Sequence, residues 1–81
     1  MTIRDEIEEQ FRQVAAEHNV QLAPLTDDLE LLASGLDSLG FAVVVVRLES
    51  ALGFDPFSAS DDSVSAVTFG EFVKLYENVA Q

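Results

Sequence analysis

Residues 37–53 read Asp-Ser-Leu-Gly-Phe-Ala-Val-Val-Val-Val-Arg-Leu-Glu-Ser-Ala-Leu-Gly, and this stretch decides the fold class. Its four consecutive valines favour a strand, because β-branched side chains fit a pleated sheet well. Its second half instead interleaves polar residues with leucine and alanine at helical spacing, and Gly53 stands where a helix would stop. The rest of the chain offers no second strand for pairing. We therefore predict a helix over residues 37–52 and an all-α fold.

A first amphipathic helix is expected before this stretch. Thr2 is its predicted N-cap, and the helix runs to about His18, which is expected to cap backbone carbonyls. One apolar stripe defines its core-facing side: Ile3, Ile7, Phe11, Val14 and Ala15.

A last helix is marked by the run Thr68-Phe69-Gly70-Glu71, which has the spacing of a capping box. Val67 and Phe72 stand at the positions of a hydrophobic staple. The apolar face that follows contains Phe69, Phe72, Val73, Tyr76 and Ala80.

Two loops join the helices. Residues 19–36 carry too many leucines for a solvated linker, so we predict a long ordered loop whose leucines pack on the core. Residues 54–66 are rich in serine and aspartate, with one short helix expected near 58–63. The predicted architecture is a small four-helix bundle, with three main helices and a short one, forming a single domain over residues 1–81.

Composition excludes several function classes. Fifteen acidic residues against four basic ones give a net charge of -11, which disfavours nucleic acid and anionic membrane surfaces as partners. Without cysteine and with His18 as the lone histidine, nucleophilic catalysis has almost no available groups, and no acidic run has calcium-loop spacing. We expect no metal site, no membrane insertion and no enzyme, but a monomeric cytoplasmic protein.

The segment Gly35-Leu36-Asp37-Ser38-Leu39 places a serine hydroxyl in the first turn of the central helix. Each residue also has an ordinary structural explanation, with Asp37 as N-cap and Leu39 as core. In this setting the chain resembles the acyl carrier protein family, including the peptidyl carriers. The resemblance covers the acidic first helix, the leucine-bearing loop, the Asp-Ser-Leu motif and the helices that follow.

The resemblance implies that Ser38 carries 4′-phosphopantetheine, which a phosphopantetheinyl transferase attaches using coenzyme A and magnesium. Asp37 and Leu39 complete the motif. The prosthetic group would hold an acyl or aminoacyl group as a thioester, while an acyl- or aminoacyl-loading ligase and downstream acyl-transfer enzymes perform the chemistry.

The chain also departs from the pattern of fatty-acid carriers, which resemble Asp-Ser-Leu-Asp followed by further acids. Here Gly40 follows the motif, and Val43, Arg47 and Ser50 stand where acidic or neutral polar residues are frequent, so that only Glu49 is retained. We therefore expect a discrete carrier in a specialised biosynthetic pathway rather than in bulk fatty-acid synthesis. The alternative is an acidic helical adaptor that binds a protein partner without a prosthetic group.

Two apolar faces are expected on the central helix. The core-facing set is Phe41, Val44, Val45, Leu48 and Leu52. On the other side we predict an exposed docking surface beside Ser38, formed by Leu39, Val43, Val46, Arg47 and Glu49. The alternative is that leucines of the 19–36 loop cover the three aliphatic residues.

Overall fold

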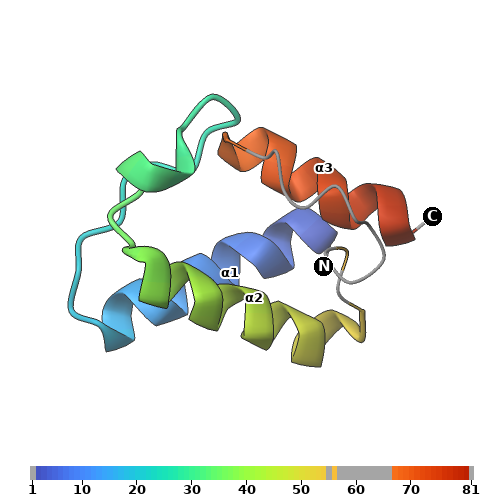
Figure 1. Cartoon of the computed structure of the whole chain (residues 1–81), viewed down its shortest axis with the longest axis horizontal. Coiled ribbons are helices and arrows are strands. Elements are labelled where there is room, and N and C mark those ends of the chain that lie inside the picture. Colours follow the sequence, from blue (N-terminus) through green and yellow to red (C-terminus); the bar gives the residue numbers. More distant parts are fainter. Residues whose placement is uncertain (1, 55, 57–66, 81) are drawn as a thin grey trace.

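The computed structural model describes residues 2–54, 56 and 67–80. It contains helices α1 (Ile3–Glu17), α2 (Ser38–Leu52) and α3 (Phe69–Ala80), with a short 3-10 helix, η1 (Leu31–Ala33), between α1 and α2 (Figure 1). The predicted all-α class is confirmed, since the described residues form no strand beyond one isolated bridge. The short helix expected near residues 58–63 lies outside the described part of the chain.

The first helix begins as its sequence predicts. The Thr2 hydroxyl accepts the Asp5 amide at 3.1 Å, and the Asp5 carboxylate accepts the Thr2 amide at 3.3 Å, which completes a capping box. His18 ends α1, with its backbone amide donating to the Val14 carbonyl at 2.9 Å. In the described ranges, no helix has the length and apolarity that a membrane crossing requires.

The valine-rich stretch is helical, so the prediction for α2 is confirmed. The Asp37 carboxylate caps its start by accepting the Gly40 amide at 2.8 Å. Gly53 closes its end in the left-handed region, at φ 85°, with its amide on the Glu49 carbonyl. Burial of Val44 and Leu48 against the other helices offsets the weak helix propensity of valine.

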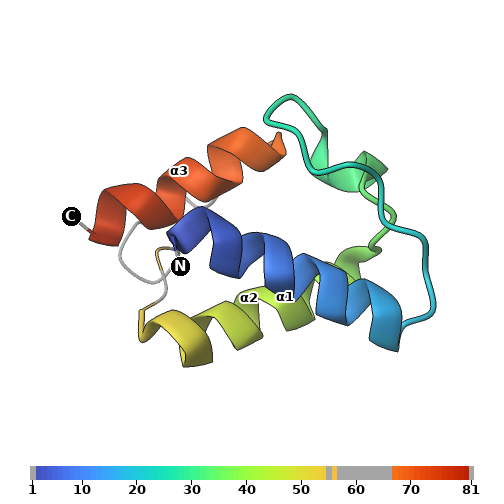
Figure 2. The same ribbon diagram turned by 180° about the vertical axis from the view of Figure 1, so that it is seen from behind.

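α1 is the central helix, and both α2 and α3 pack on it (Figures 1 and 2). The Phe11 ring of α1 lies 6.4 Å from Phe41 of α2 and 5.3 Å from Phe69 of α3, both in edge-to-face geometry. α2 and α3 meet through aromatic rings, with Phe41 on Phe72 at 5.2 Å. The core is thus an aromatic cluster arranged around α1.

The predicted core-facing set of α2 is confirmed, since Phe41, Val45 and Leu52 pack on the core beside buried Val44 and Leu48, but the buried face is wider than predicted. Val44 and Leu48 are fully buried, but Val43 is partly buried against the core, so its predicted exposure is wrong. Gly40 has so little space that an added Cβ would lie 3.3 Å from Leu36, and Arg47 binds side chains of α1. Positions 40, 43 and 47 share one helical stripe, so Val43 lies between a buried glycine and an arginine that binds α1.

The long loop is ordered by its leucines, as predicted. Those packed on the core are Leu22, Leu25, Leu29 and Leu31. Leu32 differs from them, because 94% of its surface is exposed.

Three backbone hydrogen bonds, here called the clamp, join the end of this loop to the start of α3. The Leu31 amide donates to Val67 at 2.9 Å, the Phe69 amide to Leu29 at 2.8 Å, and the Gly70 amide to Asp27 at 3.0 Å. A Cβ on Gly70 would lie 2.9 Å from the Asp27 carbonyl oxygen, so only glycine fits this approach without a shift.

Candidate functional site

Ser38 is the first residue of α2, and its side chain is exposed. The first amides of a helix lack intrahelical acceptors, and the Asp37 carboxylate takes the Gly40 amide. The amides of Ser38 and Leu39 therefore remain at the helix end, beside the Ser38 hydroxyl. A helix N-terminus of this kind favours negative charge such as a phosphate.

The glycine of the motif is explained by the backbone. Gly35 has φ 109°, outside the range that other residues readily adopt, and an added Cβ would lie 2.4 Å from the Gln21 carbonyl oxygen. Ser34, the preceding residue, is buried and donates its hydroxyl to the Leu31 carbonyl at 2.7 Å. The loop therefore enters α2 along a fixed path that sets the position of Ser38.

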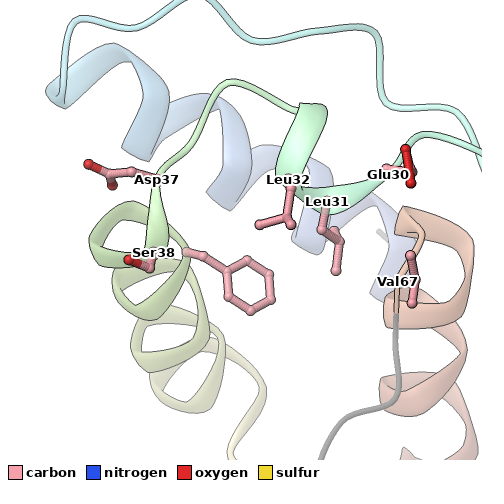
Figure 3. A pocket seen from close by; sticks show the side chains of 7 residues that line it. Glu30, Leu31, Leu32, Asp37, Ser38 and Val67 are labelled. Atoms are coloured by element: carbon pink, nitrogen blue, oxygen red, sulfur yellow. The ribbon is translucent and has the colours of Figure 1, made fainter.

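An apolar cavity of about 300 Å³ lies beside Ser38 (Figure 3). Segments far apart in the sequence line it: Glu30, Leu31, Leu32, Asp37, Ser38, Phe41 and Val67. The Leu31 and Leu32 side chains extend from η1 into the space between η1 and α2, whereas the Asp37 side chain points away from it (Figure 3). Such a cavity can receive an uncharged apolar group close to the Ser38 hydroxyl.

The predicted docking residues separate into two groups. Leu39 and Val46 are 67% and 65% exposed, and Glu49 is exposed with them on the solvent side of α2. Arg47 instead donates to Gln13 at 3.0 Å and to the Glu17 carboxylate, which ties α2 to α1. We call Leu39, Ala42, Val46 and Glu49 the outer face of α2.

The cavity is the part of the site that sequence reasoning missed. The clamp brings the loop and the start of α3 together in one wall of the cavity, and no periodic pattern relates Leu31 to Val67. The only available signal was the excess of loop leucines, which does not distinguish exposed Leu32 from its buried neighbours.

No group of three or more acidic or histidine side chains in the described ranges could hold a metal ion. Comparison of the chain with protein-family models, curated proteins and solved structures found no match.

Proposed function

We propose that this protein is a discrete acyl or aminoacyl carrier that bears 4′-phosphopantetheine on Ser38. The observation that supports this most is the exposed serine hydroxyl at the N-terminus of α2, directly beside an apolar cavity. The proposal includes a short fourth helix near residues 58–63, which would complete a four-helix bundle. Its setting is cytoplasmic and monomeric, in a specialised pathway.

The residues around Ser38 fit such a group. Its hydroxyl is accessible, and the neighbouring amides at the helix end suit a phosphodiester. The Asp37 carboxylate is held on the Gly40 amide, so it does not occupy the amides of Ser38 and Leu39. When bound, the prosthetic group supplies the thiol that carries the acyl group as a thioester.

Attachment would form a phosphodiester between the Ser38 oxygen and the phosphopantetheine phosphate. The pyrophosphate bond of coenzyme A would break, adenosine 3′,5′-bisphosphate would leave, and the hydroxyl proton would pass to a base on the transferase. The chain's own contribution is to expose Ser38 and to hold it at a fixed helix end.

Partners would approach along the outer face of α2. Leu39 and Val46 offer exposed aliphatic contact beside Ser38, and Glu49 adds a single carboxylate. A transferase, a loading ligase and downstream acyl-transfer enzymes would share this face. Because the Arg47 charge is engaged by Glu17, binding should depend on apolar contact more than on salt.

The same outer face would also serve the alternative function, an acidic adaptor that binds a protein without modification. The exposed Leu39 and Val46 and the net charge of -11 are compatible with both. Only modification of Ser38 distinguishes the two.

The first prediction concerns this modification. Wild-type protein incubated with coenzyme A, magnesium and a broad-specificity phosphopantetheinyl transferase should gain the mass of one phosphopantetheinyl group, measured on the intact protein. Ser38→Ala should gain none. Ser50→Ala, which alters another exposed serine of α2, should gain the group like the wild type.

No gain by the wild type with several transferases would favour the adaptor. A gain by Ser38→Ala would place the attachment on another residue.

A further inference from the structure

Arg4, in the first turn of α1, contacts three segments of the molecule. Its guanidinium lies 3.1 Å from the Glu8 carboxylate within α1 and 2.7 Å from the Asp27 carboxylate in the long loop. The same group lies 5.4 Å from the centre of the Phe69 ring, at the start of α3. One side chain thus joins α1, the loop and α3.

Asp27 and Phe69 are also members of the clamp. The Asp27 carbonyl accepts the Gly70 amide, and the Phe69 amide donates to Leu29. Arg4 therefore binds the side chains of two residues whose backbones join the loop to α3. Among the described residues, the Arg4–Asp27 pair is the only ion pair between α1 and this loop.

The clamp also builds one wall of the cavity beside Ser38. Glu30, Leu31 and Val67 line the cavity, and all three lie within or next to the clamp. The opposite wall is α2, with Asp37, Ser38 and Phe41. The α2 wall is packed on α1 and buries Val44 and Leu48, whereas the clamp wall is formed by the loop and the start of α3.

The segments that form the two walls of the cavity are joined by different kinds of contact. Contact between α2 and α3 is through aromatic rings such as Phe41 on Phe72, whereas the loop and α3 share backbone hydrogen bonds. The clamp consists of three bonds at the end of a loop, so its local opening should cost less free energy than global unfolding.

We propose that Arg4 is a positioning residue for the cavity. It latches residues 27–31 and the first turn of α3 onto α1 and so holds them against each other. When the latch is released, the clamp, and with it this wall of the cavity, opens more often. The consequence for a group carried on Ser38, namely that the latch controls its access to the cavity, rests on the proposed function. The latch itself does not depend on the proposed function.

Hydrogen exchange of single amides tests the latch on the unmodified protein. The clamp amides of Leu31, Phe69 and Gly70 report opening of the wall, and the Gly40 amide reports the start of α2. In Arg4→Gln the three clamp amides should exchange roughly threefold to tenfold faster, the range that one exposed ion pair and one cation–π contact support. The Gly40 amide should not change.

Two variants make the comparison specific. Arg12→Gln removes the same charge and also a contact with Glu8, at 3.2 Å in the wild type, but Arg12 has no described contact with the clamp. It should leave the clamp amides at wild-type rates. Asp27→Asn removes the partner of Arg4 and should reproduce the effect of Arg4→Gln, which keeps the test available if that variant folds poorly.

The salt dependence of amide exchange distinguishes the latch from a general stabilising role of Arg4. Added NaCl screens the exposed Arg4–Asp27 pair, so exchange of the clamp amides relative to Gly40 should rise in the wild type and stay constant in Arg4→Gln. Equal acceleration of the clamp and Gly40 amides in Arg4→Gln would overturn the latch. Unchanged clamp amides, or the same acceleration in Arg12→Gln, would overturn it as well. The mass test on Ser38 is independent of every one of these results.

Discussion

Thr68 and Glu71 hold the first turn of α3 through reciprocal hydrogen bonds. The Thr68 hydroxyl accepts the Glu71 amide at 3.2 Å, and the Glu71 carboxylate accepts the amides of Thr68 at 3.1 Å and Val67 at 2.8 Å. These amide donors, that of Val67 first, lower the pKa of Glu71. The predicted capping box is confirmed, while packing of Val67 on Phe72 stays a prediction, with Val67 57% exposed.

Thr68→Ala should lower the free energy of unfolding by about 1 kcal/mol, because one amide at the helix end loses its acceptor. Thermal or urea denaturation at neutral pH measures this loss. A melting curve identical to that of the wild type would contradict the cap.

The Glu71→Gln variant tests the same capping box through the pH dependence of its contribution to stability. Because folding lowers the pKa of Glu71, its contribution is present above the unfolded pKa and is lost as pH falls through the folded pKa. The stability difference between wild type and Glu71→Gln should therefore shrink from neutral pH to about pH 3. Caps of this kind could be predicted from the sequence because all their partners lie within four residues.

At the level of the helix, α2 shows what periodicity can and cannot predict. The capped ends at Asp37 and Gly53 and the helical state between them follow from local signals. The extension of its buried face to Val43 does not, because it depends on the space at Gly40 and on the pairing of Arg47 with Glu17, a residue of α1. Contacts between distant segments are absent from a helical pattern.

Val43 and Val46 form a matched pair on α2 that tests whether the buried face extends to Val43. Val43→Asp should lower the free energy of unfolding by about 1–3 kcal/mol, because a charge enters a partly buried position. Val46→Asp, at a position 65% exposed, should leave the melting temperature nearly unchanged.

If the outer face docks partners, Val46→Asp should also slow modification by the transferase, on the order of tenfold. Val46→Asn separates the added charge from the lost aliphatic contact. A large loss of stability in Val46→Asp, or an unchanged modification rate, would remove this residue from the docking surface.

The whole molecule is dominated by its charge of -11. Several acids are compensated inside the fold, notably Glu8 by Arg4 and Arg12, and Glu17 by Arg47. Among the described residues, most of the other acids form no ion pair, so the folded state concentrates negative charge that the unfolded chain spreads out. The excess charge follows from composition, and the pairs of Glu8 follow from helical spacing within α1. The Arg47–Glu17 pair could not be predicted from the sequence, because it links separate segments.

The free energy of unfolding should therefore rise with ionic strength, measured by urea denaturation between about 0.02 and 0.5 M NaCl. The exposed substitutions Glu49→Gln and Glu77→Gln, which remove charge without a described partner, should reduce the slope. A stability that falls with salt would mean that the few ion pairs outweigh the general repulsion.

The central position of α1 also has a consequence for the order of folding. Both α2 and α3 make their main helix contacts with α1, so neither is expected to form a stable pair with the other while α1 is unstructured. Direct pairing of α1 with α2 closes residues 18–37, whereas direct pairing of α1 with α3 would close residues 18–68 at greater entropic cost, so α1 and α2 should pair first. Until α3 docks, Phe69 and Phe72 do not cover the Phe11 ring, and the aromatic surface exposed at that stage would favour aggregation.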